Sequence, residues 1–127
     1  MSLTHSTVAM MLPVSDVDRA RTFYTESLGL DYTGTDQEGS AIYALDGGPT
    51  LVLLPRPGSR PSESTAMSFE VDDLTAEISD LEQRGVVFED YDLPDLKTVD
   101  HVAVMGAEKA AWFKDPDGNV LCLHQEG

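Results

Sequence analysis

The chain repeats itself, and this internal duplication constrains the fold more than any other feature. The string VSDV at residues 14–17 returns as VDDL at residues 71–74, 57 positions later. Near the end of each half, GPTLVL at residues 48–53 matches GNVLCL at residues 118–123, at an offset of 70. A repeat of this length indicates one supersecondary unit used twice. We therefore expect two copies of one module within a single domain.

The first module is predicted to span residues 1–57. An apolar run with β-branched residues at 5–13 predicts a strand. Ser15 is the expected N-cap of a following helix, which Gly29 ends. Three short strands are then expected near residues 30–35, 40–45 and 50–54. The module therefore has the order βαβββ.

The second module is predicted to span residues 64–127, after a linker rich in proline and serine. Its expected elements are a strand at 66–71, a helix capped by Asp72 or Asp73 and ended by Gly85, and strands near 86–91, 109–113 and 120–124. Because the second offset exceeds the first by 13, an insertion is expected around residues 92–101. Such a loop is either a lid, with Tyr91, Leu93, Lys97 and His101 over the mouth of a site, or flexible surface.

Charge and cysteine content exclude several classes of partner. The formal net charge of −15 repels nucleic acid phosphates and anionic lipids, so we expect no nucleic acid and no membrane as partner. The acidic excess would attract a cationic ligand, although a soluble, self-repelling surface explains it without any ligand. Cys122 is the only cysteine, and the first residues lack the pattern of a secretory signal, so we expect a cytoplasmic protein.

Three strings in this order resemble the vicinal oxygen chelate superfamily, which includes glyoxalase I, extradiol dioxygenases, and bleomycin and fosfomycin resistance proteins. They are VSDVDRARTFYTESLGL, FEVDDLTAEISDLEQRGV and AAWFKDPDGNVLCL, and the resemblance covers nearly the whole chain. It implies an α+β fold in which two tandem βαβββ modules form a curved mixed sheet around a cleft. Relatives often pair through their sheets, so the resemblance also implies a homodimer.

The resemblance implies where a metal would bind. Metal-dependent members place ligands on the first and last strands of each module, and those positions fall here on Ala9, Val52, Ala66 and Cys122. The three aliphatic side chains cannot coordinate an ion, and one thiolate cannot replace the roughly four to six ligands that a divalent ion takes. We therefore predict that the usual metal site is absent and that no cofactor binds.

Strand parity extends the predicted cleft-facing set beyond these four positions. Side chains alternate along a strand, so residues two apart share a face. The resulting face is mostly apolar with a few polar groups, which is typical of a small-molecule pocket. The predicted ligand-binding residues are Ala9, Met11, Val52, Leu54, Ala66, Ser68, Glu70, Trp112, Cys122 and His124.

Trp112 and Glu70 are the predicted residues most able to direct a ligand. Because Lys114 shares the face of Trp112 and prefers water, we place Trp112 on the cleft side and Phe113 on the helix-covered side. The indole could stack on a planar ligand or hold a cation, unless it only packs. Glu70 could act as a general base or pair with a cation if the cleft desolvates it; otherwise it is a strand-end carboxylate in water.

Two arrangements of histidine and cysteine are weaker candidates. Cys122 and His124 could form a nucleophile and base, but residues two apart on a strand are separated by about 6.6 Å along the backbone. A buried free cysteine is also ordinary core packing. A displaced metal site could use His5, Glu70 and His124, although their spacing matches no metal motif. The catalytic residues are therefore unknown.

The sequence favours a small-molecule-binding protein that works without metal, with a cationic or aromatic organic molecule as its ligand. An alternative is a metal-dependent glyoxalase-like lyase or isomerase, or a dioxygenase, that uses a non-standard site. A third hypothesis is a scaffold whose own side chains fill the cleft.

Overall fold

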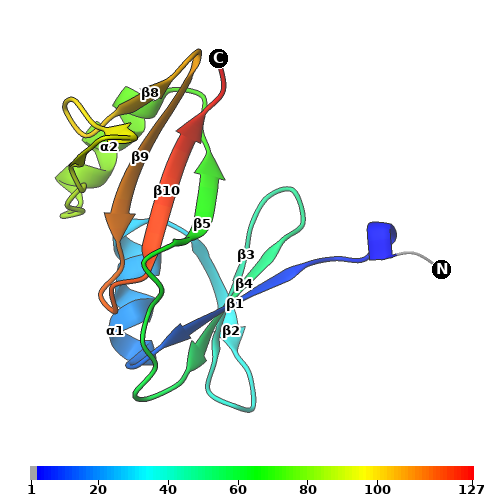
Figure 1. Cartoon of the computed structure of the whole chain (residues 1–127). Coiled ribbons are helices and arrows are strands. Elements are labelled where there is room, and N and C mark those ends of the chain that lie inside the picture. The colour runs from blue at the N-terminus through cyan, green and yellow to red at the C-terminus, as the bar shows by residue number, and fades with distance from the viewer. Residues whose placement is uncertain (1–2) are drawn as a thin grey trace. The chain divides into compact units, whose positions relative to one another are not determined.

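A computed structural model describes residues 3–127 and divides the chain into two units, Met1–Arg60 and Pro61–Gly127. In each unit the first strand pairs in parallel with the last strand, and a helix follows the first strand (Figure 1). Each unit holds a four-stranded mixed sheet. The structure is therefore α+β, which confirms the predicted fold class.

The first unit forms its sheet in the order β1-β4-β3-β2, and only the β1–β4 pair is parallel. Its elements are η1 (Leu3–His5), β1 (Ala9–Val14), α1 (Val17–Thr22), the π-helical turn η2 (Phe23–Ser27), β2 (Asp31–Thr35), β3 (Ala41–Ala44) and β4 (Thr50–Pro55). Leu12 and Val14 of β1 are buried with Tyr24, whereas Met11 is 55% exposed. One face of this sheet therefore joins the core and the other is open.

The second unit repeats this plan in the order β5-β10-β9-β8, with β5–β10 as the parallel pair. Its elements are β5 (Thr65–Glu70), α2 (Leu74–Gln83), β6 (Asp92–Leu93), β7 (Leu96–Lys97), β8 (Ala103–Met105), β9 (Glu108–Lys114) and β10 (Val120–Gln125). The strands β6 and β7 form a separate two-stranded hairpin. Leu74, Ile78 and Leu81 of α2 are buried, as are Phe113 and Leu121 of the sheet, so α2 covers one sheet face.

The prediction of a strand at residues 86–91 is wrong. Only Phe88 forms a bridge there, to Phe113, and the Glu89 N–H donates to the Trp112 carbonyl at 2.8 Å. The chain then leaves the sheet, forms the β6–β7 hairpin and returns as β8, which pairs with the other end of β9. The insertion thus divides the strand at the edge of the sheet into two parts, the Phe88 bridge and β8. The apolar pattern of residues 86–91 reflects the burial of Phe88 rather than a continuous ladder of strand hydrogen bonds.

Both helices begin at an aspartate N-cap. Asp16 and Asp73 each accept a hydrogen bond, at 3.1 Å, from the backbone N–H three residues on. The prediction of Ser15 as the first cap is wrong, because the helix begins at Val17 and the cap is the residue directly before it. Among residues 3–127, no helix has the length and apolar character needed to cross a bilayer.

The Asp73 cap is testable against its exposed neighbour. We expect Asp73→Ala to lower the free energy of unfolding by about 1 kcal/mol, because the N–H groups of the first helical turn lose their acceptor. Asp72→Ala, the matched control, should change it by less than about 0.5 kcal/mol. Urea unfolding followed by circular dichroism measures both. Equal losses in the two variants would contradict the cap assignment.

Candidate functional site

The sheet face opposite α2 in the second unit, here called the open face, carries most of the predicted binding residues of that unit. Cys122 pairs with Ser68 on one side and with Trp112 on the other, so the three residues form one row across the sheet. His124 pairs with Glu70 in the next row. The register thus brings five predicted residues from three strands together.

Two neighbours hold Trp112 in place on the open face. Its indole N–H donates to Thr65 Oγ1 at 3.2 Å, and its ring meets the ring of Tyr91 edge to face, with centroids 5.7 Å apart. Burial, reinforced by the charge of Glu89, raises the pKa of the Tyr91 hydroxyl. Phe113 lies on the other face and is fully buried. The aromatic pair therefore presents an apolar surface on which a planar group can pack.

A pocket of about 510 Å³ adjoins this aromatic pair. Tyr91, which contacts Trp112, also lines the pocket, together with Lys114, Val120 and residues 61–63. Lys114 and Val120 pair with each other across β9 and β10. Each lies two residues along its strand from Trp112 or Cys122, so both are on the open face. The volume lies within the range of about 300–1,000 Å³ typical of small-molecule sites.

His124 lies between two carboxylates on the open face. Its Nδ1 is 2.5 Å from Glu70 Oε1 and its Nε2 is 2.9 Å from Glu108 Oε1. Strands β5, β10 and β9 each contribute one member of this set, which we call the carboxylate–imidazole triad. Because both ring nitrogens are engaged, neither is free to coordinate a metal.

The triad raises the pKa of His124. Desolvation of the ring acts to lower the pKa, but the hydrogen bonds and charges of Glu70 and Glu108 outweigh it, so the pKa lies above 6.5. Because the pKa of His124 is higher in the folded than in the unfolded state, protonation of the imidazole stabilises the fold. This stabilisation is complete below pH 6.5, as long as Glu70 and Glu108 are still ionised. This contribution is lost as the pH rises through the folded-state pKa.

We expect Glu70→Gln to lower the pKa of His124, because a neutral amide no longer stabilises the imidazolium. The pH titration of the His124 Hε1 resonance by NMR measures this pKa directly. Glu126→Gln removes a nearby exposed carboxylate outside the triad and serves as the matched control. An unchanged His124 pKa in Glu70→Gln would show that the two side chains do not pair in solution.

The positions that a metal-dependent relative would use do not suit an ion. Ala9, Val52 and Ala66 carry no donor atom, which leaves Cys122 as the one candidate ligand of the four. The part of the chain that the structure describes holds no group of three or more His, Cys, Asp or Glu side chains suited to a metal. His5 lies in η1 of the first unit and is exposed. The residues present therefore do not fit the usual metal centre.

The predicted residues of the first unit also share the open side of their sheet. In the parallel ladder of β1 and β4, Ala9 pairs with Thr50, Met11 with Val52, and Pro13 with Leu54. Ala9 and Met11 are exposed, whereas Val52 is buried. In the second unit, Ala66 lies where the β5–β10 register shifts and has no partner in the ladder.

Cys122 is buried in the open face, and its Sγ lies 3.3 Å from the Leu123 carbonyl oxygen. Burial raises the pKa of the thiol, although hydrogen bonding by Ser68 acts in the other direction. The thiolate that would attack an electrophile is therefore disfavoured near neutral pH. The arrangement suits a packing role better than nucleophilic catalysis.

We expect Cys122 to react slowly with iodoacetamide at pH 7.5 in the native protein and rapidly in 8 M urea. The native rate should be at least about tenfold lower, because the thiol is both buried and held in its neutral form. Intact-mass spectrometry over time measures both rates. Similar rates in the two conditions would show that the thiol is accessible and activated.

The residues expected to form a lid divide between the two sides of the sheet. Tyr91 contacts Trp112 on the open face, whereas His101 lies 3.5 Å from Glu82 of α2, on the opposite side.

Glu108 was not among the residues predicted from the sequence. It lies four residues before Trp112 on the same strand, so the alternation of side chains would have placed it on the open face.

Comparison with known proteins identifies relatives over nearly the whole length. The family model of the Glyoxalase/Bleomycin resistance protein/Dioxygenase superfamily matches residues 5–123. No curated protein matches the sequence.

Solved structures share the fold. TnmS3, an antibiotic binding protein from Streptomyces sp. CB03234, is 28% identical with a TM-score of 0.70, covering 100% of this chain and 99% of its own. A superfamily member from Sphaerobacter thermophilus DSM 20745 is 24% identical with a TM-score of 0.77, covering 98% of this chain and 100% of its own. UcmS2 is 22% identical with a TM-score of 0.73, covering 98% of each chain. The last two show the fold alone.

Proposed function

Because this chain belongs to the glyoxalase/bleomycin resistance protein/dioxygenase superfamily, we propose that it binds a small organic molecule on the open face without a metal. The observation that carries the proposal is the Trp112–Tyr91 pair beside a pocket of about 510 Å³. The 28% identity to an antibiotic binding protein over the full length supports the same class of function. Sequestration of a ligand requires no catalytic residue.

An aromatic group is the ligand feature that the open face favours most. Trp112 is half-buried, so part of its ring remains available, and its N–H is already satisfied by Thr65. Packing a planar group there removes apolar area from water and gains the preferred ring geometry, with about 0.5–1.5 kcal/mol beyond the buried area. The fixed indole also loses little conformational freedom on binding.

A positive charge is the second favoured feature of the ligand. Glu70 and Glu108 flank His124 on the same face, and the carboxylates outnumber the imidazolium even when His124 is charged. The chain as a whole carries a formal charge of −15, which raises the local concentration of cations. A cation over the indole gains a further contribution from the ring quadrupole.

The absence of metal ligands supports binding rather than metal-dependent turnover. Ala9, Val52 and Ala66 offer no donor, and both nitrogens of His124 are engaged by carboxylates. These residues therefore offer no ligands for a metal ion that would act as a Lewis acid, and no free imidazole that would act as a base. Dimerisation and a cytoplasmic location stay predictions from the sequence.

Calorimetric titration tests the proposal with two planar three-ring probes of opposite charge. We expect proflavine, a cation, to bind saturably and anthracene-2-carboxylate to bind at least about tenfold more weakly, because the open face is acidic. The same titration with bleomycin tests an antibiotic of the class that gives the superfamily part of its name. Liquid chromatography of each mixture after incubation should recover the probe unchanged.

Trp112→Ala should weaken proflavine binding by about tenfold or more, and Trp112→Phe by less, because a phenyl ring keeps part of the stacking surface. Val87→Ala changes an exposed apolar residue elsewhere in the same unit and is the control. Thermal melting of each variant verifies that it folds. Equal affinity in the wild type and Trp112→Ala would refute the open-face site.

A further inference from the structure

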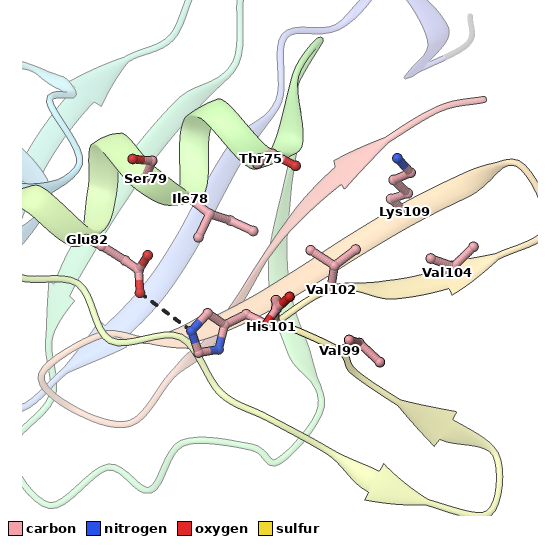
Figure 2. Close-up of a pocket in the computed structure, with 10 residues that line it drawn as sticks. Thr75, Ile78, Ser79, Glu82, Val99, His101, Val102, Val104 and Lys109 are labelled. Carbon is pink, nitrogen blue, oxygen red and sulfur yellow. Dashed lines mark ion pairs between the residues drawn. The ribbon is translucent and has the colours of Figure 1, made fainter.

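A second pocket lies on the α2 side of the same unit, away from the open face. It has a volume of about 530 Å³ and opens between α2, the end of the insertion and the β8–β9 edge of the sheet (Figure 2). We call it the α2 pocket, lined by Thr75, Ile78, Ser79, Val102, Val104 and Lys109, with His101, Asp100 and Glu82 at one end. Val99 completes the lining. The first unit has no counterpart of the insertion that closes this pocket.

One face of α2 forms a wall of this pocket. Thr75, Ile78, Ser79 and Glu82 follow the i, i+3, i+4, i+7 spacing that puts residues on one side of a helix. Ile78 is buried, and Thr75 and Ser79 line the same pocket. The helix therefore presents an apolar floor with hydroxyl groups beside it.

At the acidic end of the α2 pocket, His101 pairs with two carboxylates of the protein. His101 Nε2 lies 3.5 Å from Glu82 Oε2 and its Nδ1 lies 3.0 Å from Asp90 Oδ2. The backbone at Asp100 and His101 has φ values of 51° and 72°, a left-handed conformation that non-glycine residues adopt at a cost. The fold thus holds His101 against Glu82 by a strained turn, and the Asp100 carboxylate, next to His101 in the chain, also lines the pocket.

Three further polar groups of the lining, all hydrogen-bond donors, have no partner among the residues that the structure describes. Across residues 3–127, no hydrogen bond or ion pair engages the Lys109 ammonium or the hydroxyls of Thr75 and Ser79. All three can donate a hydrogen bond. Val102 and Val104 lie near Lys109 and extend the apolar lining (Figure 2). Away from its acidic end, the pocket therefore combines a cationic donor, two hydroxyl donors and an aliphatic wall.

We propose that the α2 pocket binds small aliphatic carboxylates, with the carboxylate on Lys109 and Thr75 and the alkyl chain against Ile78 and the two valines. A carboxylate accepts hydrogen bonds from the ammonium and the hydroxyl and compensates the one unpaired cation of the lining. Its chain removes the aliphatic wall from water. This site is independent of the function proposed for the open face.

NMR titration of the full chain with sodium hexanoate tests the proposal, with hexylammonium chloride as the probe of opposite charge. We expect saturable shifts of the Ile78, Val102 and Val104 methyl resonances with hexanoate and at least about tenfold weaker binding of hexylammonium. Lys109→Gln should weaken hexanoate binding by at least about tenfold, and Lys109→Arg should restore most of it. Hexylammonium binding equal to or tighter than hexanoate would overturn the proposal.

Two controls separate this site from the rest of the molecule. Lys97→Gln removes a lysine that pairs with Asp92 on the hairpin, outside the pocket lining, and should leave hexanoate binding unchanged. Trp112→Ala should also leave it unchanged, so failure of the open-face proposal would not be confused with failure of this one. Methyl shifts that do not saturate, or that persist in Lys109→Gln, would exclude the α2 pocket as a carboxylate site.

Discussion

Parallel pairing of the first and last strands of each unit is the constraint on which the rest of the structure depends. Parallel neighbours cannot be joined by a tight turn, so the whole module must lie between them in sequence. The β1–β4 and β5–β10 ladders each enclose one helix and two antiparallel strands. With a single α-helix in each unit over residues 3–127, only one face of each sheet packs against a helix of its own unit.

At the positions where a metal-dependent relative would hold its ion, the second sheet offers no donor apart from the Cys122 thiol, and its open face is where we propose that a ligand binds. In this sheet the two expected ligand positions hold Ala66 and Cys122, and both ring nitrogens of His124 are engaged by carboxylates, so these residues do not form a metal centre. Trp112 is a large aromatic side chain on this face, and its ring orientation is fixed by the hydrogen bond to Thr65 and the edge-to-face contact with Tyr91. Rigid aromatic groups of this kind carry much of the affinity in binding sites.

The insertion in the second unit has a structural role on both sides of the sheet. It departs next to Tyr91, whose ring packs on Trp112, and returns through His101, which pairs with α2. Its ends are therefore anchored on opposite faces of the sheet. One chain segment consequently contributes to the walls of two separate pockets.

Much of the fold was predictable because it follows from local periodicity. The repeat predicted two βαβββ modules, and strand parity placed Trp112 and Phe113 on opposite faces, as observed in the register of β9 and β10. The strand at 86–91 was not predictable in this way, because alternating burial looks the same whether a segment makes one bridge or a full ladder. Glu108 was missed, since no local pattern pairs it with His124.

The sequence by itself determined the duplicated α+β module, the alternation of faces and the chemical character of the four expected ligand positions. These follow from residue type and spacing along the chain. The tertiary structure decided which side chains meet: Glu70, His124 and Glu108 come from three strands, and Tyr91 reaches Trp112 from outside the sheet. Such contacts depend on cross-strand register and on the path of the insertion, which are set by packing between distant segments rather than by local sequence.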